Sequence, residues 1–421
     1  MPRLSHLSYF LGLKRSTVGM LGMVILVGMG EKMAERFLPI YLMALGGGAL
    51  SVGLLNGLDN LLSALYSFPG GYLSDRLGTK RALLVFNMVA MVGFTVVILI
   101  PAWQAVLVGA VFFLSWTAIS LPATMSLVAK VLPTHKRTMG VTMHSLVRRI
   151  PMALGPILGG LCIGVWGERE GVRIAFVVAL FLSFVAAGIQ QLLIEEDRPQ
   201  VTGKGTTARL EKNPFRLFRD MNSPLKRLLA SDILVRFCEQ IPYAFVVVWC
   251  MKTIAEPVSA FRFGILTAIE MTTALLIYIP VAYFADRSSK KPFVVVTFIF
   301  FTLFPLLLLL SQSFKWLVFA FILRGFKEFG EPTRKALIMD LAPEDRKAAM
   351  FGLYYLIRDV IVSTAAFGGA FLWEIGPATN FVVASLCGLL GTVGFALFGG
   401  DLDEMNDKSH IFGAKGRMNP D

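Results

Sequence analysis

Histidine and cysteine, which most often hold soft metals or act as nucleophiles, are scarce in this chain. Its 421 residues include only 4 of each. The histidines are scattered, and no HExxH pair, Walker A loop or nucleophile elbow occurs, so nothing indicates an enzyme or an ATP-driven pump. The cysteines lie in apolar segments without CxxC spacing: Cys162, Cys238, Cys250 and Cys387. We expect packing residues rather than disulfides or zinc ligands, and no catalytic residue, metal site or organic cofactor.

Charge is also sparse. Charged residues make up 16% of the chain against 55% hydrophobic residues, and the mean hydropathy is +0.67. Apolar runs recur instead, each long enough to cross the ~30 Å of hydrocarbon in a bilayer. Because these runs do not alternate, they do not suit a β-barrel. They cover residues 17–45, 49–73, 82–100, 103–132, 140–165, 174–194, 228–251, 261–284, 292–310, 314–342, 350–373 and 381–398. We predict an all-α membrane protein with twelve transmembrane helices.

Acidic residues are fewer than basic ones: the chain has 28 Asp and Glu but 40 Lys and Arg, and its formal net charge is +12. Nucleic acid is one partner that such an excess suits, but the placement of the charge argues for a lipid bilayer. About 25 of the basic residues fall in the two tails and the even-numbered loops, against about five in the odd-numbered loops. This asymmetry follows the positive-inside rule. We expect both termini in the cytoplasm, a multi-pass protein of the plasma (inner) membrane, and no nucleic-acid partner.

Only one long polar stretch interrupts the chain, and it separates six predicted spans from six. The sequence therefore predicts two six-helix bundles joined by a cytoplasmic linker. The five expected regions are an N-terminal tail (1–15), the first bundle (16–194), the linker (195–227), the second bundle (228–398) and a C-terminal tail (399–421). Both tails are expected in the cytoplasm.

The two predicted bundles repeat one pattern of residues about 211 positions apart. The first copy consists of Asp59, Pro69, Tyr72, Asp75, Arg76, Lys80 and Arg81. The second copy consists of Glu270, Pro280, Tyr283, Asp286, Arg287, Lys290 and Lys291. Arg148 and Arg358 correspond at nearly the same offset. The repeat predicts two pseudo-symmetric halves that arose by duplication, an arrangement found in many transporters.

Ionisable residues within the predicted spans are the strongest functional signal, because each costs at least about 2.5–3.5 kcal/mol at the bilayer centre. They are concentrated on spans one, seven and ten. The candidate cavity residues are Glu31, Lys32, Glu35, Arg36, Asp59, Asp232, Arg236, Glu239, Glu270, Arg324, Lys327, Glu328, Glu331 and Arg358. At about 100° per residue, the charges of span one cover roughly 140° of arc and those of span ten about 120°. We expect them to line a shared polar path.

The alternative is that these charges form ion pairs that join one helix to another. Lys32 lies three residues from Glu35, so local pairing is available. Buried ion pairs often cost more than they return, however, and a watered cavity relieves that cost. Glu31 and Glu35 are like charges one turn apart, and two such carboxylates do not both ionise easily at reduced dielectric. We expect an intramembrane acid to exchange protons, with the proton as coupling ion, unless the adjacent bases neutralise these acids permanently.

The predicted turn after span two contains a complete short motif. Its residues are Gly71, Asp75, Arg76, Gly78, Lys80 and Arg81, in the pattern Gly-x-x-x-Asp-Arg-x-Gly-x-Lys-Arg. The chain here resembles the major facilitator superfamily, and the resemblance extends over residues 16–398. It implies a twelve-helix transporter in which Asp75 and Arg76 latch the two halves on the cytoplasmic side. The second copy retains Asp286 and Arg287, but Ala282 and Ser289 replace its glycines.

Span five contains a second, partial motif. Gly155, Pro156, Gly159 and Gly160 look like the core of the GPxxGG motif of proton-coupled antiporters in this superfamily, which implies a hinge in helix five. Glycines permit close helix approach and proline bends a helix, so packing alone is the other explanation. Pro151 stands where that motif has an earlier glycine. The arginine usual in helix four is absent, and its duplicated counterpart Arg324 is a candidate for that role.

The sequence therefore predicts a secondary transporter, with spans one, four, seven and ten lining the path as the resemblance implies. We expect a monomer that exports a small organic, amphiphilic solute in a proton-linked cycle. A second hypothesis is transport of an organic anion held by Arg36, Arg236, Arg324 and Arg358. Two further alternatives are divalent-metal transport by the carboxylates, since hard cations prefer oxygen ligands, and a transporter-shaped sensor or assembly factor.

Overall fold

The computed structural model describes residues 15–114, 116, 120, 124, 137–195, 218–285, 289–343 and 347–400, and every regular element in these ranges is helical. The first half contains α2 (Arg15–Glu35), α3 (Leu38–Ala44), α4 (Ala49–Leu77), α5 (Thr79–Leu99), α6 (Trp103–Phe113) and α8 (Arg137–Leu193). The second half contains α10 (Ser223–Tyr243), α11 (Phe245–Val248), the π-helical turn η2 (Trp249–Thr253), α12 (Ala260–Ala285), α13 (Lys291–Leu310), α14 (Phe314–Phe326), α15 (Glu331–Leu341), α16 (Lys347–Ile375) and α17 (Pro377–Phe398).

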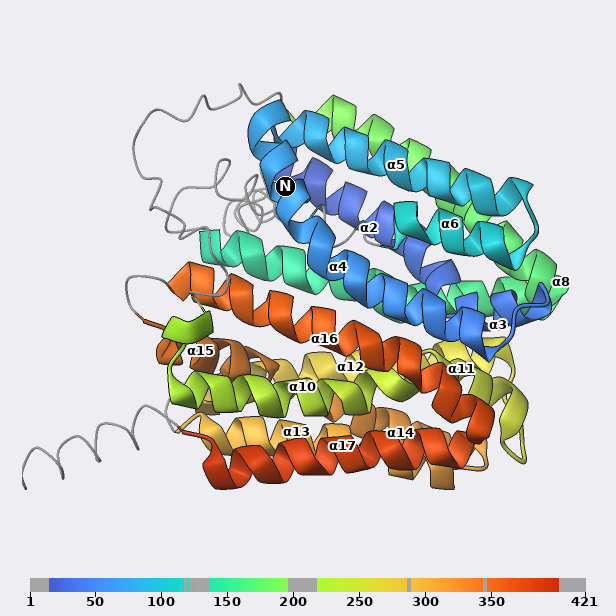
Figure 1. Ribbon diagram of the computed structural model, residues 1–421. Coiled ribbons are helices and arrows are strands. Elements are labelled where there is room, and N and C mark those ends of the chain that lie inside the picture. Colours follow the sequence, from blue (N-terminus) through green and yellow to red (C-terminus); the bar gives the residue numbers. More distant parts are fainter. Residues whose placement is uncertain are drawn as a thin grey trace, which may run out of the picture.

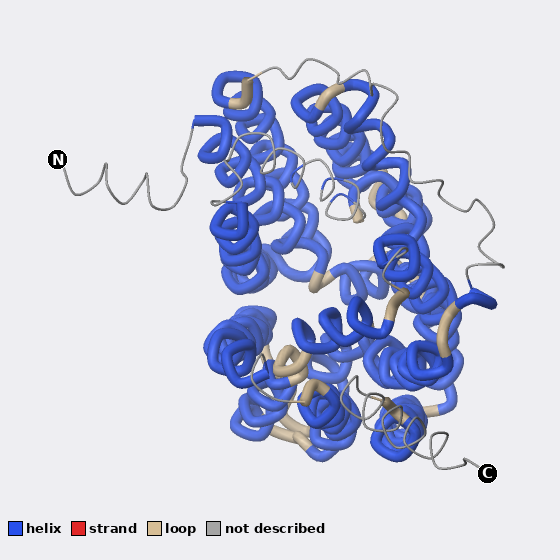
Figure 2. Tube along the Cα trace, turned by 90° about the vertical axis from the view of Figure 1, so that its left-hand side faces the viewer, coloured by secondary structure: helices blue, strands red, loops and turns tan. Residues whose placement is uncertain are grey.

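The helices form two bundles that lie against each other, α2–α8 in the first and α10–α17 in the second (Figures 1 and 2). Within the bundles α2 packs along α8 and α10 along α17, whereas α12 and α16 contact α8 and α4 across the junction. The long α8 is two helices that meet at Gly167, where a φ of 79° reverses the chain. Seven described helices are long and apolar enough to cross a membrane, or eight if the bent α10–α11–η2 pair is one span. The predicted all-α, two-bundle membrane architecture is confirmed.

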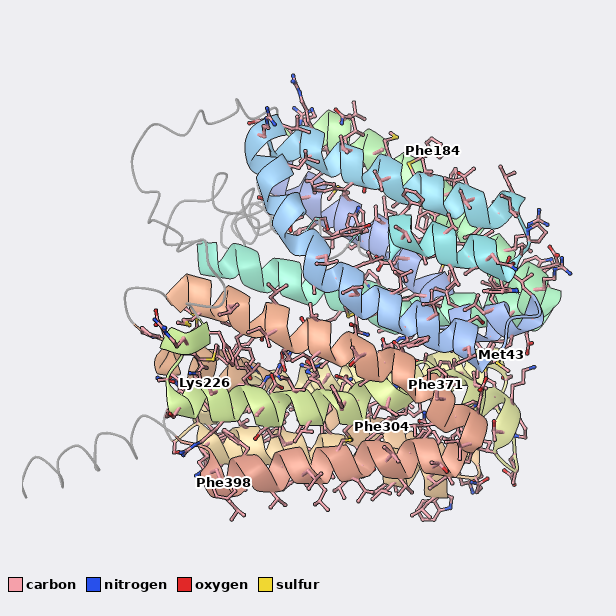
Figure 3. The ribbon with its side chains drawn as sticks, in the orientation of Figure 1. Met43, Phe184, Lys226, Phe304, Phe371 and Phe398 are labelled. Atoms are coloured by element: carbon pink, nitrogen blue, oxygen red, sulfur yellow. The ribbon has the colours of Figure 1, made fainter. Side chains whose placement is uncertain are left out.

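The outward faces of both bundles are apolar. Phe184 on α8 is 58% exposed, and Phe398 at the end of α17 is 62% exposed (Figure 3). Contact of such a surface with water would cost about 25 cal/mol per Å² of apolar area. Helices also satisfy their backbone hydrogen bonds internally, which is what a segment surrounded by lipid must do. The outer surface therefore suits the hydrocarbon of a bilayer.

Arginines join helix ends at one end of the bundles. At one end, which we call the basic end, Arg15 donates to the carbonyl of Leu192 at 3.0 Å and Arg227 to that of Phe398 at 3.3 Å. The opposite end, the distal end, contains the turn at Gly167. In each bundle the start of the first described helix therefore lies at the same end as the finish of the last one. Such an arrangement is expected when a chain crosses the membrane an even number of times. That the basic end faces the cytoplasm stays a prediction.

Three of the predicted spans are interrupted. Span 17–45 breaks between α2 and α3, span 314–342 breaks between α14 and α15, and span 228–251 bends by 42° where α10 meets α11. Both α3 and α15 begin with a proline in the first turn, Pro39 and Pro332. A proline is tolerated there because its missing N–H would have no helical partner. Backbone irregularity at membrane depth survives only where it faces protein or a cavity, so the breaks mark the functional interior.

The two bundles approach each other closely through glycines toward the distal end. Gly57 of α4 lies against Phe367 of α16, and Gly160 of α8 lies against Ala260 of α12. A Cβ atom at either glycine would overlap its neighbour, so glycine lets the helices touch. One hydrophobic core also contains residues of both bundles. The distal sides of the bundles are therefore packed together.

Two glycines of α8 provide a matched test of this packing. A Cβ on Gly159 would overlap the carbonyl of Met33 on α2, whereas one on Gly164 would meet no atom within 4 Å. We expect Gly159→Val to lower the apparent melting temperature in detergent by at least about 3 °C, because overpacking costs about 1–3 kcal/mol. Gly164→Val, with the same loss of flexibility, should stay within about 1 °C of the parent. Equal shifts in both variants would show that glycine is not needed for the α2–α8 contact.

Candidate functional site

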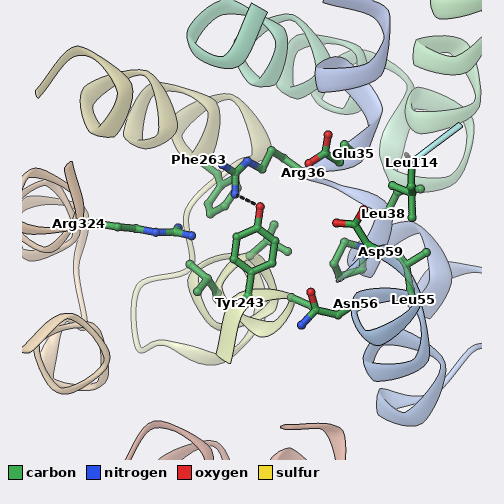
Figure 4. Close-up of a pocket in the computed structure, with 14 residues that line it drawn as sticks. Glu35, Arg36, Leu38, Leu55, Asn56, Asp59, Leu114, Tyr243, Phe263 and Arg324 are labelled. Carbon is green, nitrogen blue, oxygen red and sulfur yellow. Dashed lines mark hydrogen bonds between the residues drawn. The ribbon is translucent and has the colours of Figure 1, made fainter. Parts of the chain in front are cut away.

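A cavity lies between the two bundles, next to the break between α2 and α3 and the bend between α10 and α11 (Figure 4). Its empty volume is about 510 Å³, counting space open to solvent. It is lined by Glu35, Arg36, Leu38, Pro39, Leu55, Asn56, Asp59, Leu114, Tyr243, Ala244, Val246, Val247, Phe263 and Arg324. Cavities that are mostly apolar, with a few convergent polar groups, are typical binding sites for small organic molecules.

One lysine on α2 contacts two carboxylates. The Lys32 ammonium is 3.4 Å from Glu31 and also donates a hydrogen bond to Glu35, three residues on. Glu31 is buried at 3% exposure, whereas Glu35 lines the cavity. The three charges by themselves sum to −1 when both acids are ionised. An ammonium has three donors and is able to serve both acids, but it neutralises only one of them.

Arg36 joins the two bundles across the cavity. Its guanidinium donates to the Tyr243 hydroxyl at 3.0 Å and lies 5.4 Å from the centre of the same ring. Arg324, from α14 on the opposite side, lies 5.7 Å from that ring (Figure 4). Two arginines therefore flank one tyrosine. Among the described residues Arg36 has no carboxylate at ion-pair distance, so its charge is held by an aromatic ring and a hydroxyl.

Asp59 is the second charged group of the cavity without an opposite charge in contact. It comes from the middle of α4, a half-buried position. Within the described part of the chain it makes neither a hydrogen bond nor an ion pair. Figure 4 places its carboxylate on the same side as Glu35, away from Arg324. The acids on this wall thus come from α2 and α4 of the first bundle.

The second bundle holds a continuous network of ion pairs. Arg236 contacts Glu239 at 2.6 Å and Glu331 at 3.3 Å. Lys327 continues the network from Glu239 at 2.8 Å to Glu270 at 3.6 Å. Altogether the connected side chains are Asp232, Arg236, Glu239, Glu270, Arg324, Lys327, Glu331, Arg334, Lys335, Arg358 and Asp359. Six bases and five acids are therefore joined across α10, α12, α14, α15 and α16.

The most buried part of this network surrounds Asp232, which is 0% exposed. Arg334 forms an ion pair with it, Tyr354 donates a hydrogen bond at 2.9 Å, and Arg358 lies 3.4 Å away. These partners from α15 and α16 offset the loss of solvation that a buried carboxylate suffers. Asp232 does not line either cavity, so its position suits a structural ion pair.

A smaller cavity lies behind Arg324, within the second bundle. Its empty volume is about 280 Å³. It is lined by Glu239, Val246, Phe300, Phe301, Phe304, Arg324 and Lys327. Arg324 and Val246 line both cavities. The Arg324 guanidinium also lies 3.3 Å from Glu270, whose carboxylate is completely buried and accepts no hydrogen bond in the described part of the chain.

Further polar contacts cross between the bundles. Arg149 of α8 is 3.4 Å from Glu328, in the break between α14 and α15. The Asn56 amide donates to the backbone carbonyl of Gln240 at 2.9 Å, and Asn60 donates to its side chain at 3.1 Å. These bonds would have to break or exchange partners if the bundles moved apart.

The predicted cavity residues are thus found in three settings. Glu35, Arg36, Asp59 and Arg324 line the first cavity, and Glu239 and Lys327 line the second. The other second-bundle residues are ion-paired away from both, whereas Glu31, Lys32 and Glu328 belong to the contacts described above. Whether any of them couples to protons or substrate stays a prediction. Among the described residues no three His, Cys, Asp or Glu side chains form a group suited to a metal ion.

Sequence reasoning missed Tyr243 and Asn56, which line the cavity. Tyr243 follows Pro242 at the end of α10. A proline within a span that carries charged residues is a sequence feature that could have pointed to this position. Asn56 lies three residues before Asp59 on the same helix face, a spacing that brings the two side chains together. Both side chains are neutral, so a search for charge within the spans does not find them.

The predicted gate is only partly described. Arg76 is exposed, Gly78 has a φ of 84° and joins α4 to α5, and Lys80 donates to the carbonyl of Gln191 at 2.8 Å. Lys80 therefore ties α5 to α8 within the first bundle. Arg81 is also exposed. The surroundings of Gly71 and of the Asp75 side chain are not among the described parts of the chain, and neither are Asp286 and Arg287. The latch between the two halves stays a prediction.

The glycine motif of α8 lies at contacts with other helices. Gly155 and Gly159 pack against the backbone of α2, and Gly160 packs against α12 of the other bundle. The only non-helical residue within α8 is Gly167, beyond the motif, so the described helix runs through Pro156 unbroken. These positions suit close packing, and a hinge there stays a prediction.

Comparisons with known proteins agree with this architecture. The model of the Major Facilitator Superfamily matches residues 20–255 and 228–413. An uncharacterized MFS-type transporter of Methanocaldococcus jannaschii is 22% identical over 386 residues, which cover 86% of this chain and 89% of that protein. The multidrug resistance protein MdtG of Klebsiella pneumoniae is 26% identical over 313 residues, or 71% of each chain.

Two solved structures illustrate the similarity of the fold. The nucleoside transporter NupG has a TM-score of 0.73 at 15% identity, covering 91% of this chain and 99% of that one. A mutant of a peptide transporter POT in complex with sulfate has a TM-score of 0.73 at 14% identity, covering 91% of this chain and 94% of that one. At these identities the likeness concerns the fold alone.

The Asp232–Arg334 pair can be tested by a double-variant cycle. We expect Arg334→Met to destabilise the protein by about 3–5 kcal/mol, because it leaves a buried carboxylate short of a positive partner. Combining it with Asp232→Asn should recover a large part of that loss, which thermal unfolding in detergent would measure. The control is Lys290→Met, whose pair with Asp340 is partly exposed and should contribute under about 1 kcal/mol. A double variant no more stable than Arg334→Met would contradict a structural role for the pair.

Proposed function

Because the chain belongs to the Major Facilitator Superfamily, we propose that it is a secondary transporter that exports a small organic solute in exchange for protons. In this proposal it acts as a monomer in the plasma membrane, with the basic end in the cytoplasm. The bundles rock about the cavity between them, so that it opens to one side of the membrane at a time. The observation that carries the proposal is a cavity at the bundle junction whose charged groups come from both bundles, Glu35, Arg36 and Asp59 from the first and Arg324 from the second.

The closed distal side supports this cycle. Gly57 and Gly160 bring the bundles together there, and apolar residues of α3 and α11 line the cavity beside them. This conformation would hold the cavity away from the distal side, and opening would require these contacts to separate. The relative MdtG is named a multidrug resistance protein, which favours export over uptake.

Glu35 is the acid best placed to couple protons to transport. It lines the cavity and shares Lys32 with the buried Glu31, while Asp59 is the other acid on this wall. A proton on Glu35 would remove its charge and leave Lys32 to pair with Glu31 alone. The cavity would thereby gain one positive charge and change its affinity for a charged solute. Proton uptake from the distal side and release to the cytoplasm would then drive export.

Substitution of Glu35 tests this coupling. In liposomes with a pH gradient, we expect the parent protein to move at least one compound from a panel of cationic, anionic and zwitterionic organic solutes against its gradient. Glu35→Gln should lose this pH-driven movement at least tenfold, while solute exchange between equal pH values continues, because exchange requires no net proton transfer. The control Glu170→Gln, which removes an exposed carboxylate paired with Arg173 of the same helix, should behave like the parent.

Two outcomes would contradict the proposal. Undiminished pH-driven transport by Glu35→Gln would rule out Glu35 as the coupling acid. Absence of exchange in the parent protein, for every compound of a chemically broad panel, would favour a sensor or assembly factor of the same shape.

A second candidate function is transport of an organic anion. Arg36 and Arg324 both face the cavity, and the network behind Arg324 contains one more base than acids. Arginine is well suited to holding carboxylates and phosphates, because its planar fork donates two parallel hydrogen bonds. If this function is correct, Arg324→Ala should abolish anion uptake while proton flux through the protein is unaffected. Export of cationic dyes by that variant at the parent rate would favour the first candidate's proton-linked export.

A further inference from the structure

The two walls of the first cavity carry opposite charges. Glu35 and Asp59 lie on the wall formed by α2 and α4, whereas Arg324 comes from α14 on the facing side (Figure 4). Arg36 leaves the first wall and places its guanidinium on Tyr243 of the second bundle, 3.0 Å from the hydroxyl. The cavity is therefore negative along one side and positive along the other.

On each wall one charge has no opposite charge in contact. Glu35 pairs with Lys32 and Arg324 pairs with Glu270. Asp59 and Arg36, in contrast, contact no opposite charge within the part of the chain that the structure describes. Both line the cavity, so both are accessible to a molecule inside it. Unpaired charges at reduced dielectric are unfavourable unless a ligand or water compensates them.

We propose that the transported solute is a zwitterion, a molecule whose cationic group pairs with Asp59 and whose anionic group pairs with Arg36 beside Tyr243. This inference rests on the proposed transport function and names the chemical class of its solute. A simple anion would leave Asp59 unpaired in a cavity from which it displaced water. A simple cation would do the same to Arg36. Only a solute with both charges satisfies both walls, so selectivity arises partly from penalties against the singly charged competitors.

The apolar part of the lining determines what lies between the two charges. Leu38, Leu55, Val246 and Phe263 contribute to it. A compact hydrocarbon or aromatic spacer would be covered by these side chains, at about 25 cal/mol per Å² of buried apolar area. A strongly hydrated sugar-like spacer would lose hydrogen bonds to water there. The expected solute is thus an amino acid-like molecule with an apolar body.

A matched set of probes distinguishes the charge requirements. The zwitterion is 4-(aminomethyl)benzoate, the anion is 4-methylbenzoate and the cation is 4-methylbenzylamine, all of nearly the same size and shape. The unbranched zwitterions from 4-aminobutyrate to 6-aminohexanoate vary the distance between the charges. Binding to the purified full-length protein in detergent at pH 7 would be measured by calorimetry. We expect at least one zwitterion to bind tenfold or more tightly than its singly charged analogues.

Variants of the two unpaired charges provide the second half of the test. Asp59→Asn should reduce zwitterion affinity to that of the matched anion, because only the arginine side remains. Arg36→Gln should reduce it to that of the matched cation, and Arg36→Lys should restore part of the loss because it keeps the charge. Asp340→Asn and Arg173→Gln, which lie outside both cavities, are the controls and should leave affinity within twofold of the parent.

Three outcomes would overturn the assignment. The first is equal affinity for the zwitterion and a singly charged analogue. The second is unchanged zwitterion binding by folded Asp59→Asn or Arg36→Gln protein. The third is no detectable binding of any zwitterion in the set. Folding of each variant would be checked by thermal unfolding. Because binding is measured without a pH gradient, these failures differ from those of the coupling test at Glu35. If proton coupling were absent but the preference for zwitterions remained, only the proposal of proton-linked export would be contradicted.

Discussion

The cost of removing charge from water is the constraint on which the whole molecule depends. Each ionised side chain within the spans would be unfavourable against lipid by several kcal/mol. The second bundle meets this cost by pairing, as around Asp232, where Arg334, Tyr354 and Arg358 all converge. The first bundle meets it only in part, because Asp59 and Arg36 face a cavity instead. The distribution of paired and unpaired charges therefore separates the region that stabilises the protein from the region able to bind a solute.

The interruptions of the helices follow from the same constraint. A continuous helix offers no backbone group to a solute and holds its side chains at fixed angles. The breaks after Glu35 and between Phe326 and Glu331, and the bend at Tyr243, allow side chains of the same span to point in different directions. Arg36 consequently reaches the other bundle while Glu35, one residue earlier, stays on its own wall. Where the structure describes the spans, the three with the densest charge are the ones found interrupted.

The bundle architecture was predictable from the sequence because it depends on properties that are additive along the chain. Hydropathy over some twenty residues identified the spans, and the repeat that includes Asp59 and Glu270 identified the two halves. The cavity was less accessible. Helical spacing places Glu31, Lys32, Glu35 and Arg36 on one face, but it does not tell which residue of another helix each will meet. Lys32 pairs within its own helix, whereas Arg36 contacts Tyr243, 207 residues away in the sequence. Asp232 and Asp59 looked alike as isolated acids, and only the packing of α15 and α16 makes one of them structural.

The hydrogen bond from Arg36 to Tyr243 has a consequence for the efficiency of the carrier. It links the bundles when no solute is present, so an empty molecule must break it in order to reorient. A hydrogen bond to a charged group contributes about 1.5–3 kcal/mol, which corresponds to roughly a 10- to 150-fold slower step if the bond is lost before the barrier. A solute that supplies an anion to Arg36 in place of the tyrosine would lift that hindrance. In the proposed exchange cycle the return step carries the proton but no solute, so breaking this one contact would limit how fast the carrier turns over.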